Sequence, residues 1–144
     1  MAEFLHFVCP SCDTVNRVPV EKLKSGGKCG KCQARLFPGK PIALDEGNFA
    51  RHIGRNDIPV LVDFWAAWCG PCQAMAPVFE QAARELEPNA RLAKVDTEAS
   101  QSLARQFAIR SIPTLILFKE GREVARISGA VGLRELLGWT QRHL

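Results

Sequence analysis

Two cysteines separated by two residues, Cys69 and Cys72, follow a strongly apolar segment and open a predicted helix. Unpaired backbone N–H groups and the positive end of the helix dipole favour a thiolate over a thiol at such a position. The second thiol lies one turn further along, close enough to form a disulfide with the first. A thiolate that attacks a disulfide, beside a thiol that resolves the mixed disulfide, predicts redox catalysis. A pair of metal ligands or unreactive buried thiols is the alternative.

The other four cysteines form two further C-x-x-C pairs near the N-terminus, Cys9 with Cys12 and Cys29 with Cys32. The spacing of the pairs is typical of a Cys₄ zinc site. Because four ligands are present, we expect one structural zinc ion; a catalytic zinc would keep an open coordination position. Two disulfides or an iron–sulfur site are the alternatives.

The amino-acid composition of the 144-residue chain changes near residue 40. Residues 1–40 hold too few large apolar side chains to form a core without a metal. The segment 37–41, rich in proline and glycine, predicts a stiff link. We therefore predict a Cys₄ zinc-finger module over 1–40 and a second domain over 41–144.

The net charge of +4 comes entirely from residues 1–40, which contain seven Lys and Arg against three acids. Four thiolates around a zinc dication lower this charge to about +2, so we do not expect a nucleic acid partner. No apolar run has the roughly 20 residues of a membrane span, and the segment 1–9 lacks the pattern of a signal peptide. We therefore expect a cytoplasmic protein with no membrane partner, in which cysteines bind metal or exchange electrons.

Beyond residue 41 the pattern alternates between strands and helices. The expected strands are 42–44, 60–66, 91–95, 114–119 and 123–128, and the expected helices are 46–54, 71–87, 98–107 (capped by Thr97) and 131–142. The run 60–66 is almost entirely apolar, which is typical of a strand buried on both faces. This order predicts an α/β fold with parallel and antiparallel strand pairs.

The second segment resembles thioredoxin along its whole length. The resemblance rests on Val62 to Ala66, Trp68 to Cys72, Ala76 and Pro77, Ile112 to Thr114, Phe118 to Gly121, and Gly129 and Ala130. With the four N-terminal cysteines included, the chain resembles the second class of bacterial thioredoxins, which carry an N-terminal zinc finger. This implies a thioredoxin fold, a central mixed β-sheet flanked by helices, preceded by a small zinc-ribbon-like module.

The resemblance also implies a protein-disulfide reductase. Cys69, at the exposed start of the helix, would attack, and the less exposed Cys72 would resolve. Gly70 and Pro71 between them would let a partner's backbone approach and favour a reducing role. The implied partners are oxidised proteins and an NADPH-dependent thioredoxin reductase. We expect a monomer with no organic cofactor.

Asp63 is a charged residue in an otherwise apolar strand. Burial would raise its pKa, so that it could act as a general base toward Cys72; a solvated aspartate is the alternative. In many relatives a buried lysine faces this aspartate. Alignment places that lysine at Leu92, and it is open whether Lys94 serves instead.

Pro113 resembles the family's cis proline, which faces the cysteines and exposes the backbone beside Ile112 to a substrate strand. A trans proline that begins a strand is the alternative. Trp68 is expected to shield the disulfide and contact partners, whereas Trp65 fits a core position equally well. The isolated histidines are expected to be surface or packing residues: His6, His52 and His143.

A rival function is a zinc-dependent interaction or holdase protein that uses the thioredoxin-like body as a scaffold. The intact pair Cys69 and Cys72 argues against it, because a scaffold requires neither thiol. The zinc module is expected to be either structural or redox-responsive. In the second case, loss of zinc would change a basic surface beside the active site.

Overall fold

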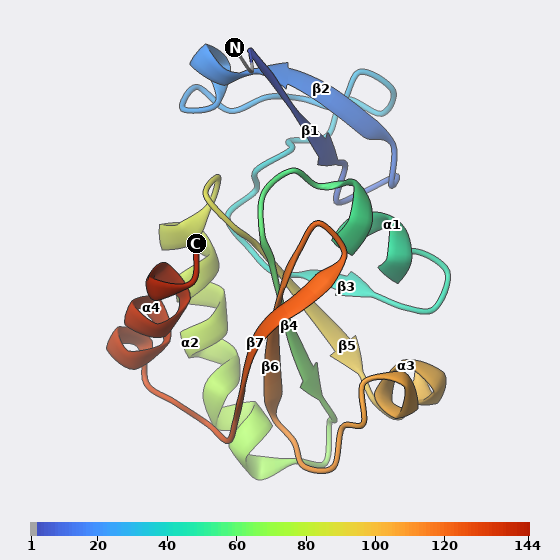
Figure 1. The fold of residues 1–144 in the computed structure, drawn as a ribbon, viewed down its shortest axis with the longest axis vertical. Coiled ribbons are helices and arrows are strands. Elements are labelled where there is room, and N and C mark those ends of the chain that lie inside the picture. The colour runs from blue at the N-terminus through green and yellow to red at the C-terminus, as the bar shows by residue number, and fades with distance from the viewer. Residues whose placement is uncertain (1–2) are drawn as a thin grey trace.

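The computed structural model describes residues 3–144, a small N-terminal module on one end of an α/β domain (Figure 1). The module contains β1 (Phe4–Val8), β2 (Val15–Pro19) and the short 3-10 helix η1 (Val20–Lys22). The domain contains β3 (Ile42–Leu44), α1 (Phe49–Arg55), β4 (Val60–Trp65), α2 (Gly70–Leu86), β5 (Arg91–Asp96), α3 (Gln101–Gln106), β6 (Thr114–Lys119), β7 (Arg122–Ser128) and α4 (Leu133–Arg142). The order of elements in the domain is the one that the sequence predicts.

Two helices begin later than predicted because the side chains before them make other bonds. Helix α3 begins at Gln101 and not directly after Thr97, because the Thr97 hydroxyl donates to the Trp65 carbonyl at 3.0 Å. Helix α1 begins at Phe49, because the Asp45 carboxylate accepts from two backbone N–H groups in a turn before it. Short polar side chains often compete with the helix in this way.

The central sheet is mixed, with the strand order β3-β5-β4-β6-β7. Strands β3, β5 and β4 are parallel, whereas β6 and β7 are antiparallel to their neighbours. The register places Lys94 of β5 and Leu115 of β6 on either side of Asp63 in β4. This mixed sheet with flanking helices confirms the predicted fold.

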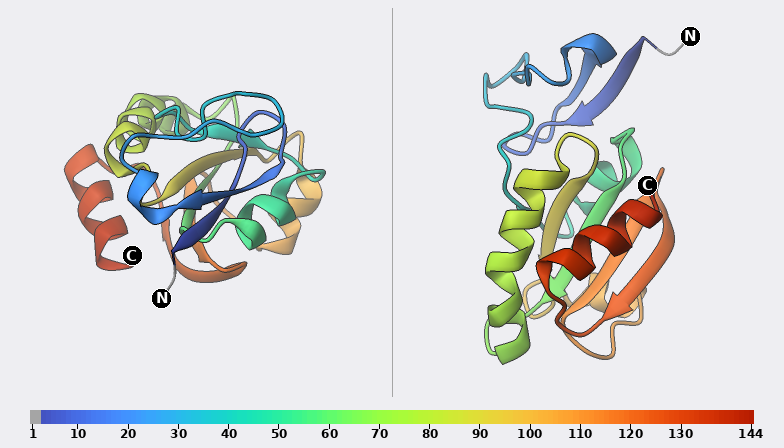
Figure 2. Two further views of the ribbon diagram at one scale, coloured as in Figure 1. Left: turned by 90° about the horizontal axis from the view of Figure 1, so that it is seen from above. Right: turned by 90° about the vertical axis from the view of Figure 1, so that its left-hand side faces the viewer.

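Helices cover both faces of the sheet (Figures 1 and 2). Alternate residues of a strand point to opposite faces. Val62 packs with Phe49 of α1 and Leu103 of α3, whereas Leu61 packs with residues of α2 and α4. Because Asp63 shares the face of Leu61, its side chain lies on the side covered by α2, the helix that begins with the cysteine pair.

The domain completes the apolar core of the N-terminal module. Phe7 and Leu36 of the module are buried in one cluster with Ile58, which belongs to the domain. The ring of Phe7 also meets the ring of Phe37 edge-on, with centroids 4.8 Å apart. The module therefore packs against the domain and is not joined to it by the chain alone.

The module and the cysteine pair of α2 lie at opposite ends of the domain. Figure 1 shows the module above the start of β4, and the start of α2 at the bottom. The six residues of β4 span about 20 Å, at roughly 3.3 Å per residue. The prediction that the module's basic surface lies beside the active site is therefore wrong. No helix of the described chain has the length and apolarity to cross a membrane.

Candidate active site and zinc site

Cys69 and Cys72 form a disulfide at the start of α2, with Cα atoms 5.2 Å apart. Cys69 is the N-cap residue of the helix, in an extended conformation, and its Sγ accepts the N–H of Cys72 at 3.1 Å. The first N–H groups of a helix have no partner within it, and here a sulfur atom fills that role. In the reduced protein, the same bond and the helix dipole would stabilise negative charge on Cys69 more than on Cys72.

The exposure of the two sulfur-bearing residues differs from the prediction. Cys69 is 4% exposed and Cys72 is 3% exposed, so neither is open to solvent in the disulfide form. Both pack with Ala66, Trp65 and Ile112. Hydrogen bonding, and not exposure, therefore distinguishes the two cysteines.

Exposed residues surround the buried disulfide. Trp68 is 69% exposed, and its indole N–H donates to the Glu98 carboxylate at 2.8 Å. Gly70 and Pro71 are exposed, and a side chain at Gly70 would meet no atom within 4 Å. The structure therefore leaves open space directly beside the cysteine pair.

A loop from the far side of the sheet reaches Cys69. The peptide bond between Ile112 and Pro113 is cis, as the resemblance implied. The Ile112 carbonyl oxygen lies 3.8 Å from the Cys69 sulfur. Together with Trp68, this loop borders the disulfide.

Asp63 is buried on the face of the sheet that α2 covers. It is 1% exposed, and neither carboxylate oxygen has a hydrogen-bond partner in the described chain. Burial raises the pKa of Asp63 to about 6, and the nearby Lys94 opposes this rise. The alternative of a solvated aspartate is therefore wrong.

The lysine beside Asp63 is Lys94 and not a residue at position 92. Lys94 lies directly across from Asp63 in the parallel register, and its ammonium group lies 4.5 Å from the centre of the Trp65 ring. Leu92 instead pairs with Leu61 in the apolar core. The alignment of the family lysine with Leu92 is corrected accordingly.

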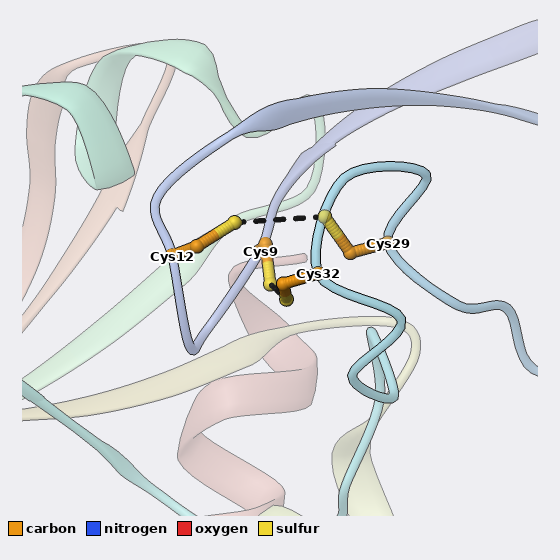
Figure 3. A group of neighbouring side chains, drawn as sticks. All are labelled: Cys9, Cys12, Cys29 and Cys32. Atoms are coloured by element: carbon orange, nitrogen blue, oxygen red, sulfur yellow. Dashed lines mark hydrogen bonds between the residues drawn. The ribbon is translucent and has the colours of Figure 1, made fainter.

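The four N-terminal cysteines lie together, as Figure 3 shows, with all Sγ atoms within 4.8 Å of one another. The Sγ atoms of Cys9 and Cys32 are 3.6 Å apart, as are those of Cys12 and Cys29. A tetrahedral zinc ion with Zn–S bonds of about 2.3 Å requires sulfur atoms roughly 3.8 Å apart. The four residues therefore fit a zinc ion.

The two knuckles that carry these cysteines have the same backbone conformation. The N–H of Cys9 and the N–H of Cys29 each donate at 2.8 Å to a carbonyl five residues further on. Asp13 and Gln33, each directly after a second cysteine, have φ of 64° and 68°. Two backbone N–H groups also donate to the sulfurs of Cys9 and Cys29, which favours the thiolate form that a metal requires. The two C-x-x-C pairs in the sequence match these two knuckles, and the structure adds that the residue after each pair has a positive φ.

Comparisons with known proteins match both parts of the chain. The pattern of the family described as thioredoxin matches residues 40–142, and the one described as thioredoxin 2, N-terminal, matches residues 8–34. The chain belongs to the thioredoxin family. It is 50% identical to thioredoxin C-3 from Corynebacterium nephridii over 137 residues, which cover 95% of this chain and 94% of that protein.

Other thioredoxins match a shorter part of the chain. The thioredoxin of Mycobacterium tuberculosis is 48% identical over 96 residues, which are 67% of this chain and 83% of that protein. The solved structure of a mutant thioredoxin from Halobacterium salinarum matches 73% of this chain and 91% of its own, with 34% identity and a TM-score of 0.66. That of Malassezia sympodialis thioredoxin has the same coverage, 31% identity and a TM-score of 0.67.

Family membership and the cysteine pair establish the activity. The protein is a thioredoxin-type protein-disulfide reductase, with a zinc-ribbon module at its N-terminus. The thioredoxin family generally reduces oxidised protein substrates and is recycled by thioredoxin reductase.

Sequence reasoning missed the side chains that join the zinc module to the thioredoxin domain. His52 of α1 is fully buried, and its Nε2 lies 2.7 Å from the carboxylate of Asp13 in the first knuckle. Burial lowers the pKa of His52, so a neutral ring that donates from Nε2 fits this contact. The available signal was the spacing of His52 with Phe49 and Ile53, which places all three on one helix face.

A second contact joins the module to the start of β5. Arg91 is fully buried, donates to the Leu36 carbonyl at 2.7 Å and pairs with Glu87. Glu87 also accepts the N–H of Gly39 at 2.7 Å. The Arg91 guanidinium lies 5.4 Å from the centre of the Phe37 ring. Arg91 and Glu87 are only four residues apart, but their contacts with Leu36, Phe37 and Gly39 connect residues distant in sequence, so no local pattern predicts that they join the module to the domain.

Proposed function

We propose that Cys69 is the attacking thiolate of the reductase and Cys72 is its resolving thiol. The observation that carries this assignment is the hydrogen bond from the Cys72 N–H to the Cys69 sulfur. A thiolate at the Cys69 position keeps that bond and the favourable helix dipole. Cys72 lies inside the first turn of α2 and has no corresponding place at the cap.

The proposed reaction transfers two electrons from the cysteine pair to a substrate disulfide. The Cys69 thiolate attacks one substrate sulfur, the substrate S–S bond breaks, and the other substrate sulfur leaves as a thiolate. Cys72 then loses its proton and attacks the Cys69 sulfur, which releases the second substrate sulfur. The protein ends as the Cys69–Cys72 disulfide, and the substrate ends as a dithiol.

Asp63 is proposed to accept the proton that Cys72 loses. Its carboxylate is buried on the α2 side of the sheet, and burial raises its pKa to about 6. A base is most useful when its pKa lies near the working pH. Lys94 keeps part of the carboxylate population ionised, since its positive charge opposes the effect of burial.

The substrate is proposed to bind across the open space beside Gly70. The exposed indole of Trp68 and the exposed Pro71 would contact it on one side. The cis segment Ile112–Pro113 would present backbone groups to it on the other, in the manner of an added strand. The Glu98 carboxylate would hold the indole in place.

The remaining features of the proposal concern the metal, partners and setting. One structural zinc ion is proposed for the four N-terminal cysteines, with a module boundary near residue 40; a redox-responsive role for it remains a hypothesis. The proposed partners are oxidised proteins and an NADPH-dependent thioredoxin reductase. We propose a cytoplasmic monomer that binds no organic cofactor or nucleic acid.

Trapping experiments test the two cysteine roles. Cys72→Ser should accumulate a stable mixed disulfide between Cys69 and an oxidised substrate, because nothing resolves it. Cys69→Ser should lose turnover and trap little substrate. Nonreducing electrophoresis and mass spectrometry of the adduct give the result. Equal trapping by both variants would reverse or abolish the assignment.

Two activities of the wild type and the Cys69→Ser variant, suppression of aggregation and reduction of a disulfide, separate the reductase from the scaffold alternative. A scaffold or holdase would suppress aggregation of an unfolded protein equally well in the Cys69→Ser variant and in the wild type. We expect reduction of a model protein disulfide to require both cysteines.

A further inference from the structure

A basic groove runs between the zinc module and the end of α2. It has a volume of about 530 Å³ and is lined by residues of the module and of the domain. Four cationic side chains border it: Lys24, Lys28 and Arg35 from the module, and Arg84 from α2. All four are exposed. Positive charges from two parts of the chain therefore meet at one hollow.

The acid that lines the groove does not neutralise these cations. That acid is Glu87, whose side chain is 3% exposed and already paired with the buried Arg91. Among residues 3–144, none of the four cations lies within ion-pair distance of a carboxylate. The groove therefore keeps an uncompensated positive charge.

Two of these cations are directly opposite each other. Lys28 and Arg35 are partners in an antiparallel bridge, so their side chains lie on the same side of it. Like charges in that arrangement repel and destabilise the pairing. The repulsion destabilises a module that has only a small apolar core to hold it together. An anionic partner would relieve this repulsion.

A second hollow extends the basic surface past Arg35. It has a volume of about 410 Å³ and is lined by Arg35, Lys40 and several proline and small residues. The two hollows share Arg35, and both are bordered by the segment 37–41. Together they form a path longer than one small anion needs, which suits an extended chain with several negative charges.

The lining of the groove favours carboxylates over nucleic acid. Proteins that bind single-stranded nucleic acid stack bases on exposed aromatic rings. Within residues 3–144, the one aromatic ring that lines either hollow is Phe37, which contacts the Phe7 ring and the Arg91 guanidinium. Arginine and lysine side chains alone pair well with carboxylates.

We propose that this groove binds an extended acidic segment of a partner polypeptide. The groove lies at the end of α2 opposite the cysteine pair, and the 17 residues of that helix span about 25 Å. An acidic segment could therefore bind the groove while Cys69 remains open to a disulfide. The module would then serve as a docking surface that the thioredoxin domain lacks by itself.

Binding of a labelled oligoglutamate peptide to the full-length, zinc-loaded, oxidised protein tests the proposal. With the Cys69–Cys72 disulfide closed, no covalent trapping can contribute to the signal. The test variant is Arg35→Glu with Arg84→Glu. The matched control, Arg105→Glu with Arg134→Glu, changes net charge equally at exposed positions of α3 and α4. Fluorescence polarisation at low salt gives the dissociation constants, and an oligoglutamine peptide measures background.

We expect the groove variant to lose affinity by about tenfold or more, and the control to change by about twofold or less, as direct ion pairs outweigh distant charges. Arg84→Gln, outside the zinc module, should give a smaller loss in the same direction even if the double variant destabilises the module. Equal losses in the groove and control variants would overturn the proposal, as would equal binding of oligoglutamate and oligoglutamine. Tighter binding of oligothymidine than of oligoglutamate at equal charge would assign the surface to nucleic acid instead.

Discussion

At the module end of the sheet, Arg91 is fully buried, pairs with Glu87 and donates to the Leu36 carbonyl. At the active-site end, Asp63 is equally buried, but neither of its oxygens accepts a hydrogen bond in the described chain. Both are charged groups within adjacent strands of one sheet. The two terminal nitrogens of Arg91 have partners, while its Nε has none in the described chain. Asp63 has only a lysine nearby, without a direct bond.

The difference supports a structural role for Arg91 and the functional role proposed for Asp63. A buried ion pair with its hydrogen bonds in place holds two surfaces in register, and removing one member leaves the other uncompensated. A buried carboxylate without partners is unfavourable when ionised, and its pKa therefore moves toward the range in which it can exchange protons. We infer that Arg91 fixes the zinc module in place, whereas Asp63 takes part in thiol chemistry.

Of the changes considered, removal of zinc should have the largest effect, because it should unfold the N-terminal module. Structural zinc sites contribute about 10–16 kcal/mol of binding free energy, and the module has few apolar residues to replace this. We expect the amides of β1 and β2 to lose hydrogen-exchange protection after chelation, whereas those of β4 and β6 keep it. Reductase turnover should stay within about twofold, since six residues of β4 separate the two ends by roughly 20 Å.

Two different outcomes would contradict this prediction for zinc removal. Continued protection of β1 and β2 after verified zinc loss would mean that the packing against Ile58 suffices without the metal. A large fall in turnover together with the lost protection would favour the hypothesis of a redox-responsive module.

Arg91→Ala should have the next largest effect. It leaves Glu87 buried without its cation, and breaking a buried pair in this way typically costs about 3–5 kcal/mol of stability. Arg126→Ala is the matched control, because it removes an arginine from the exposed pair with Glu123, where the loss should be about 1 kcal/mol or less. Urea unfolding of both variants measures the difference. Equal losses would show that burial of the Arg91 pair has no special role.

Sequence patterns predicted those features of the protein that depend only on residues close together in the sequence. The apolar run 60–66 and the spacing of the six cysteines require only neighbouring residues, and they led to the sheet, the redox pair and the zinc ligands. The pairing of Lys94 with Asp63 depends on strand register, which differs by two residues from the position that alignment suggested. A shift of two residues keeps the same face, so the periodicity could not detect it.

The missed contacts at the module interface have a related cause. His52 meets Asp13, and Arg91 meets Leu36, across separations of 39 and 55 residues. The spacing of His52 with Phe49 and Ile53 indicates a buried helix face but not the partner of His52, and no local pattern indicates the partner of Arg91. Only the packed structure places them beside their partners.

The active-site end gives a pH-dependent prediction for Asp63. Its pKa is about 6 in the folded protein against an ordinary 3.8, so the folded state binds more protons between these values. Stability should therefore fall as pH rises from about 4 to 6, and the full penalty, about 2–3 kcal/mol, should be present at pH 7. Below the ordinary pKa the carboxyl is neutral in both states and the penalty vanishes.

Asp63→Asn removes the charge with little change in shape. Relative to the wild type, the variant should gain about 2–3 kcal/mol more stability at pH 7 than at pH 4, and comparing the two pH values cancels the cost of burying an amide. Urea unfolding of the oxidised proteins measures this difference. Glu80→Gln on the exposed face of α2 is the control, and its stability should change by about 0.5 kcal/mol or less at either pH.

Asp63→Asn should also release substrate more slowly from its mixed disulfide with Cys69, because the variant lacks the base proposed for Cys72. A gain in stability without slower release would leave Asp63 a buried charge with no part in the reaction, and the contrast between the two ends of the sheet would then be one of packing alone.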